Sequence, residues 1–97
     1  MDLLDKYFDN KIIYLESIRQ DSDTILLCFC RPEPFEKLGE LVYFNTNNYN
    51  NILSFEEEEE NILESVIDFI DNDRKILLVT DSREIHFSYS TYKFNRD

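Results

Sequence analysis

Negative charge is concentrated in one segment of this sequence, from Glu56 to Asp73. The segment holds nine acidic residues and no lysine or arginine, so it carries about −9 of the formal net charge of −11. The rest of the chain is nearly balanced. Ser54-Phe55-Glu56-Glu57 precedes the acidic run with the S-x-x-E spacing of a capping box, in which Ser and Glu side chains satisfy free N–H groups at a helix start.

The segment is therefore predicted to form the principal helix, from about Ser54 to Ile70. Successive residues of a helix are turned by about 100°, which gathers the apolar residues from Phe55 to Ile70 on one face. Five carboxylates fall on a separate stripe, at spacings of three and four residues: Glu57, Glu60, Glu64, Asp68 and Asp71. Like charges at this spacing repel one another by a few tenths of a kcal/mol per pair.

The remaining elements are predicted to be short. The first residues, up to Phe8, have the apolar spacing of a short amphipathic helix that ends at Asp9-Asn10. The predicted strands are residues 11–19, 24–30, 41–45, 74–80 and a last strand that alternates from Ile85 and has a bulge or an end near Thr91. Residues 35–40 are predicted to form a helical turn, and the asparagine-rich residues 46–51 a loop.

This order predicts an α+β fold in one domain, 1–97: a largely antiparallel sheet of about five strands, packed by the long acidic helix and the short N-terminal one. The length allows one core. The sequence shows no internal repeat.

Composition also sets expectations for the compartment. The longest apolar runs are far shorter than the ~18 residues that span a bilayer, and the first residues lack the basic and apolar character of a secretory signal. Cys28 and Cys30 are two apart in a predicted strand, where their Cβ vectors are parallel, so both are expected to be free and buried. We expect a cytoplasmic protein.

The residues that catalysis requires are not found together in this sequence. The one histidine, His86, lies on the polar side of a predicted strand, and a single glycine rules out a glycine-rich phosphate loop. Neither Asp21-Ser22-Asp23 nor Asp71-Asn72-Asp73 continues as a calcium loop. We expect no catalytic residue, no metal, no cofactor and no enzyme activity.

The acidic stripe is instead interpreted as a surface for a basic protein partner. A face that serves solubility alone usually mixes charges of both signs, and anionic surfaces are repelled by nucleic acid and by anionic lipid. A merely solvated face remains the alternative. In that case an apolar and aromatic surface around Tyr43, Tyr49 or Tyr92 would be the better candidate.

In size, acidity and expected architecture, with its carboxylate-rich segment from Glu56 to Asp73, the chain resembles the immunity proteins of bacterial toxin systems, especially those of contact-dependent growth inhibition. The resemblance implies that the chain binds a toxin domain, commonly a basic nuclease, and covers its active site or substrate surface. Two alternatives stay open: a phage or plasmid inhibitor that mimics nucleic acid, of the anti-CRISPR type, and a structural adaptor subunit.

Overall fold

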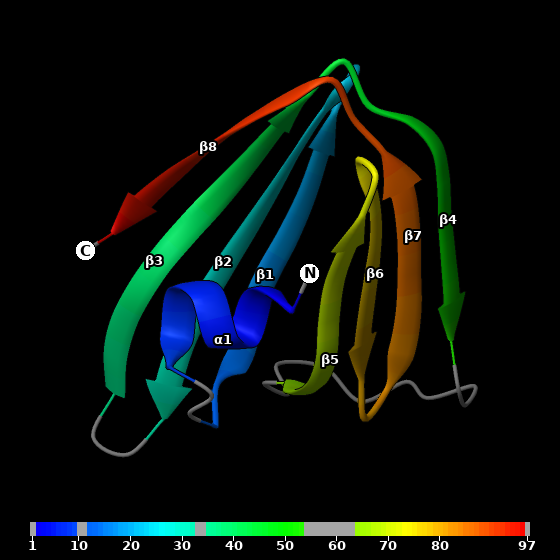
Figure 1. Ribbon diagram of the computed structural model, residues 1–97. Helices are drawn as coiled ribbons and strands as arrows, with labels where there is room; N and C mark the ends of the chain where they lie inside the picture. Colours follow the sequence, from blue (N-terminus) through cyan, green and yellow to red (C-terminus); the bar gives the residue numbers. More distant parts are fainter. Residues whose placement is uncertain (1, 10–11, 33–34, 54–63, 97) are drawn as a thin grey trace.

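The computed structural model describes residues 2–9, 12–32, 35–53 and 64–96 (Figure 1). The elements follow in the order α1 (Leu3–Phe8), β1 (Tyr14–Asp21), β2 (Thr24–Pro32), β3 (Phe35–Phe44), β4 (Asn47–Leu53), β5 (Glu64–Asn72), β6 (Lys75–Thr80), β7 (Arg83–Ser88) and β8 (Thr91–Arg96). The eight strands are antiparallel to their neighbours and lie in the order β4-β7-β6-β5-β1-β2-β3-β8.

The predicted α+β fold with about five strands and a long helix is therefore wrong. The described part of the chain is almost entirely antiparallel sheet, with one short helix. Ser54–Ile70 does not form one helix, because residues from Glu64 onward belong to β5. The first ten residues of that predicted helix lie outside the described residues.

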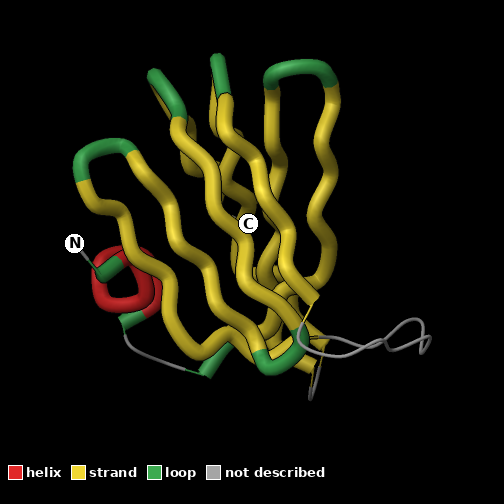
Figure 2. The backbone as a smooth tube through the Cα atoms, turned by 90° about the vertical axis from the view of Figure 1, so that its right-hand side faces the viewer, coloured by secondary structure: helices red, strands yellow, loops and turns green. Residues whose placement is uncertain are grey.

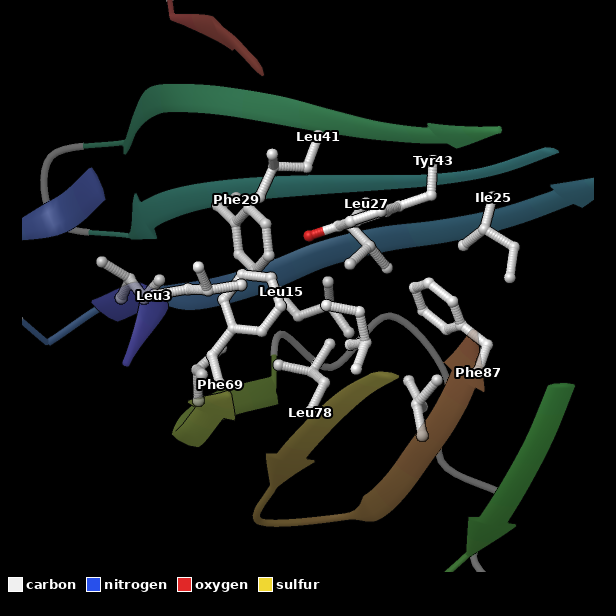
Figure 3. Close-up of a cluster of buried hydrophobic side chains, with 14 of the residues drawn as sticks. Leu3, Leu15, Ile25, Leu27, Phe29, Leu41, Tyr43, Phe69, Leu78 and Phe87 are labelled. Carbon is white, nitrogen blue, oxygen red and sulfur yellow. The ribbon is translucent and has the colours of Figure 1, made fainter. Parts of the chain in front are cut away.

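The sheet consists of two halves that face each other across the core. The first half is β1, β2, β3 and β8, and the second is β5, β6, β7 and β4. Among the described residues, two pairs join β1 to β5: Tyr14 with Ser65 and Leu15 with Glu64. Because this link is so short, the halves can diverge and enclose apolar side chains between them (Figure 3). Contacts across the core include Phe29 with Phe69, whose ring centroids are 5.4 Å apart, and Tyr43 with Phe87, at 5.0 Å.

The N-terminal helix is confirmed. The Asp2 side chain accepts a hydrogen bond from the Leu4 N–H at 2.9 Å and caps the helix start. Asp9 ends the helix in the left-handed conformation, at φ 55°. Leu3 and Phe8 are buried, and the helix lies against β5 at one side of the strand layers (Figures 1 and 2).

The two halves of the chain repeat one another. Strands β1, β2 and β3 form a meander, after which β4 crosses to the other half and pairs with β7. Strands β5, β6 and β7 form a second meander, after which β8 crosses back and pairs with β3. Figure 1 shows both crossings near the top of the molecule. We call β1–β4 the first repeat and β5–β8 the second; each gives its last strand to the other.

The residue pairing within the hairpins supports the equivalence of the first and second repeats. The β1–β2 hairpin has a bulge between Leu15 and Ser17, and Ser17 pairs with Cys28. The β5–β6 hairpin has its bulge at the equivalent place, between Val66 and Asp68, and Asp68 pairs with Val79. Tyr14 pairs with Ser65, which is its own counterpart, so the axis that relates the repeats passes through this pair.

The expectation of no internal repeat is therefore wrong at the level of structure. The sequences of the repeats share one obvious run, Ile25-Leu26-Leu27 in β2 and Ile76-Leu77-Leu78 in β6. Three shared residues are too few to show a repeat by eye. Equivalent bulges and registers become visible only when the strands are paired.

Two other predicted elements are also strands. Residues 35–40, predicted as a helical turn, belong to β3, where Gly39 adjoins a bulge at Leu38. Gly39 has φ +156°, and a Cβ there would approach the Asn95 carbonyl oxygen of β8 to 2.9 Å. The glycine thus permits close strand packing and does not end a helix. Residues 46–51, predicted as a loop, largely belong to β4, which is bulged between Asn47 and Asn50.

Candidate binding surface

The structure separates the five predicted binding carboxylates. Glu57 and Glu60 lie outside the described residues. The other three, Glu64, Asp68 and Asp71, lie on β5 in different surroundings and do not form the predicted helical stripe.

Glu64 is held within the fold. Its two carboxylate oxygens accept separate hydrogen bonds from Arg83, Oε1 from Nε at 3.0 Å and Oε2 from Nη2 at 2.9 Å. The hydroxyl of the buried Thr80 donates to Glu64 Oε1 at 2.8 Å. The side chains of Glu64 and Arg83 are only 12% and 23% exposed, so this forked ion pair is poorly screened by water. Glu64 is therefore a structural residue.

Asp71 is also engaged. The Tyr89 hydroxyl donates a hydrogen bond to Asp71 Oδ2, and the Arg74 backbone N–H donates to Oδ1 at 3.1 Å. Burial, reinforced by the Asp71 carboxylate, raises the pKa of Tyr89, which keeps the tyrosine protonated as the donor. Asp71 thus fixes the β5–β6 turn and the position of Tyr89.

Asp68 is the predicted carboxylate on β5 that is exposed to solvent. It follows the bulge in β5, and its neighbour Ile67 is 55% exposed. Of the three described members of the predicted set, Asp68 remains a candidate for partner binding.

A group of tyrosines forms a second candidate surface where α1 meets β8. The hydroxyls of Tyr7 and Tyr92 are 2.5 Å apart, and Lys6 Nζ donates to the Tyr92 hydroxyl at 3.2 Å. The Lys6 ammonium also lies over both rings, at 5.1 Å from the Tyr7 centroid and 5.9 Å from that of Tyr92. We call Lys6, Tyr7 and Tyr92 the tyrosine cluster.

The pKa values of the two tyrosines in the cluster are shifted in opposite directions. Burial, with the hydrogen bond to Tyr92, raises the pKa of Tyr7, whereas the hydrogen bond from Tyr7 lowers the pKa of Tyr92. The two hydroxyls share one short hydrogen bond, in which either oxygen can be the donor. Tyr92 is 38% exposed, so this hydrogen-bonded pair reaches the surface.

The sequence indicated this surface only in part. Tyr92 was among the aromatic alternatives, together with Tyr43 and Tyr49. Tyr43 is buried, where it stacks against Tyr92 at 5.8 Å, and burial raises its pKa. Tyr49 is half-buried on β4. Sequence reasoning missed Lys6 and Tyr7, because the N-terminal helix gave no sign of which strand it would contact.

A cavity of about 210 Å³ adjoins the cluster at the C-terminal end of α1. Phe8, Ile13 and Leu38 supply apolar lining, whereas Arg31 and Arg96 supply cations and Asp9 and Glu36 supply anions. Arg96 Nη2 donates to the Tyr7 carbonyl oxygen at 3.0 Å and so caps the helix end. Arg31 and Glu36 are 4.0 Å apart, at the limit of an ion pair. The basic residues here thus have structural roles of their own.

Other expectations concern single residues. His86 is on β7 and its Nε2 lies 3.1 Å from Glu84 Oε1. Cys28 and Cys30 are free thiols; Cys30 is fully buried, but Cys28 is half-buried.

Across the described residues, His, Cys, Asp and Glu side chains form no group of three or more that could hold a metal ion. No helix in the described part of the chain is long and apolar enough to cross a membrane.

Comparison with known proteins adds information about the fold. No known family matches the sequence, and no curated protein matches it significantly. The chain is similar to a solved structure, the crystal structure of an uncharacterized protein from Neisseria gonorrhoeae, with a TM-score of 0.57 and 16% sequence identity. The similarity covers 87% of this chain and 94% of the other. At this identity it shows a shared fold alone.

Proposed function

We propose that this chain is a binding protein that neutralises a basic protein partner, in the manner of a cytoplasmic immunity protein acting on a toxin nuclease domain. The observation that carries the proposal is the run of five glutamates, Glu56–Glu60, in a segment without lysine or arginine. Uncompensated carboxylates attract a cationic surface and speed association with it.

Two of the predicted carboxylates are less suited to partner binding than the others. Glu64 and Asp71 are used within the fold, by Arg83 and by Tyr89 respectively. We therefore assign partner binding to the run Glu56–Glu60 and to Asp68. The tyrosine cluster offers a further contact, because tyrosine gives a large rigid contact area and a hydrogen-bonding hydroxyl at low entropic cost.

The test is a double charge reversal, Glu57→Lys with Glu60→Lys, in the full chain. A partner is first identified as the protein that co-purifies with the tagged chain from its source cells, and is then purified for calorimetric titration. We expect the double variant to bind at least tenfold more weakly, and wild-type affinity to fall with added salt.

A matched control separates local from overall charge. Asp21→Lys with Asp23→Lys makes the same change in net charge at the exposed end of the β1–β2 hairpin. Binding by the control should stay close to wild type. Equal weakening in both double variants would indicate a general charge effect, and unchanged binding in the first variant would contradict the proposal.

A further inference from the structure

The two repeats interact through surfaces that do not depend on their covalent connection. Strand β8 pairs with β3 along six residue pairs, from Gly39 with Arg96 to Phe44 with Thr91. Strand β4 pairs with β7 in the equivalent way, from Asn47 with Ser88 to Leu53 with Arg83. Backbone pairing of this kind forms equally well between two chains.

The repeats are also mutually dependent. Within one repeat, β3 or β7 has a neighbouring strand on one side only, and its other neighbour comes from the other repeat. The aromatic contacts across the core, such as Tyr43 with Phe87, likewise join residues of different repeats. A first repeat thus completes its sheet and core with any second repeat, whether that repeat belongs to the same chain or to another copy.

From this arrangement we infer that two copies of this chain can form an exchanged dimer, in which the first repeat of each copy pairs with the second repeat of the other. Exchange of identical elements preserves every contact between repeats, so the dimer and the monomer differ mainly in the cost of association and in the connection. The connection runs from Leu53 to Glu64 and includes Glu56–Glu60.

Concentration and connection length should set the balance between the two forms. A short covalent connection gives the repeats of one chain an effective concentration on the order of 1 mM, so the monomer should prevail in dilute solution. Refolding near or above that concentration should yield dimer. Deletion of Glu56–Glu60 should favour the dimer further, because a shorter connection restricts pairing within one chain.

A disulfide test detects the exchange directly. Val42 and Lys93 lie opposite each other in the β3–β8 pair. In a background of Cys28→Ser and Cys30→Ala, one full-length chain carries Val42→Cys and another carries Lys93→Cys. The two chains are unfolded in denaturant, mixed, refolded and then oxidised. Because neither chain holds both cysteines, the disulfide between positions 42 and 93 requires β3 of one copy to pair with β8 of the other.

The control pair is Val42→Cys with Glu84→Cys, since Glu84 lies on β7 in the other half of the sheet. We expect the 42–93 disulfide, identified by peptide mass spectrometry, in the dimer fraction of concentrated refolding, and at least tenfold less of the 42–84 product. Wild-type chain refolded in the same way, sized by light scattering, provides a test without new cysteines. Only monomer in the wild-type sample and in the glutamate deletion, with no 42–93 disulfide, would overturn the inference.

Discussion

The two repeats share a backbone arrangement but fill equivalent positions with different chemistry. In the first repeat, Phe29 of β2 packs between Phe8 and Phe69, with ring centroids at 5.2 and 5.4 Å. Its counterpart in the second repeat is Thr80 of β6, which is buried but bonds to Glu64 and to the β6–β7 turn. The C-terminal end of β2, the aromatic end, is therefore held by ring burial, and the C-terminal end of β6, the polar end, by a network of hydrogen bonds.

This difference shows that the repeats share their strand pairing and not the side chains at equivalent positions. Aromatic packing at the first end gives α1 an apolar surface on which Leu3 and Phe8 are buried. At the second end, Thr80 accepts hydrogen bonds from the N–H groups of Ser82 and Arg83, both at 3.1 Å, which fixes a tight turn. The same hairpin register is therefore compatible with aromatic packing at one position and with hydrogen bonding at the equivalent one.

The largest expected effect is at the aromatic end. Phe29→Ala removes a ring that is 1% exposed and contacts both α1 and β5, so it should lower the free energy of unfolding by about 3–5 kcal/mol. Chemical denaturation monitored by circular dichroism measures the loss. Thr80→Val, the matched change at the equivalent position, should cost less. An equal cost at both positions would show that the two ends do not differ in this way.

The next effect is at the polar end. Glu64→Ala leaves Arg83 without its carboxylate and removes the nearer acceptor of the Thr80 hydroxyl, and should lower the free energy of unfolding by about 1–3 kcal/mol. The double variant Glu64→Leu with Arg83→Met removes both charges and should recover part of that loss. A double variant less stable than Glu64→Ala would mean that the ion pair itself, rather than the unpaired charge, determines the stability of this end.

The sequence of β5 explains why a helix was predicted where a strand forms. The segment from Ser54 has a capping-box spacing and its apolar residues fit a helical face, yet Val66, Ile67 and Ile70 are β-branched, which favours a strand. The bulge between Val66 and Asp68 interrupts the alternation of buried and exposed residues that would have marked β5 as a strand. Helical and strand patterns thus competed locally, and pairing with β6 decided between them.

Elsewhere the sequence predicted more of the structure. The β1–β2 hairpin, the central position of β2, the buried run in β6 and the N-terminal helix all follow from local patterns and are confirmed. Strand β4 was missed because its four asparagines have low β propensity, and its partner, β7, is distant in sequence. The tyrosine cluster was missed for a similar reason: it joins the two ends of the chain.

The smallest expected effect concerns the tyrosine cluster, in which the Tyr7 ring contacts Phe8 beside the aromatic end. Tyr7→Phe removes the hydrogen bond that lowers the pKa of Tyr92, so this pKa should rise toward its ordinary value of 10.0. Stability should fall by less than ~1 kcal/mol, because one exposed hydrogen bond is lost and the ring contacts stay. Ultraviolet absorbance during an alkaline titration measures the ionisation. Tyr14→Phe, on β1, is the matched control.

The same titration gives the pH dependence of folding. The pKa values of Tyr7, Tyr43 and Tyr89 are raised in the folded protein, and a tyrosine with a raised pKa favours the folded state below its ordinary pKa of 10.0. That contribution is lost as the pH rises above 10, because ionisation of the unfolded chain then draws the equilibrium toward unfolding. Tyr92, with its lowered pKa, acts in the opposite direction but is outnumbered. Wild type should therefore lose stability above pH 10, with Tyr92 ionising first. Stability that stays constant to higher pH would contradict the predicted contribution of the tyrosines with raised pKa. A first ionisation that is the same in Tyr7→Phe would show that the hydroxyls of Tyr7 and Tyr92 are not coupled.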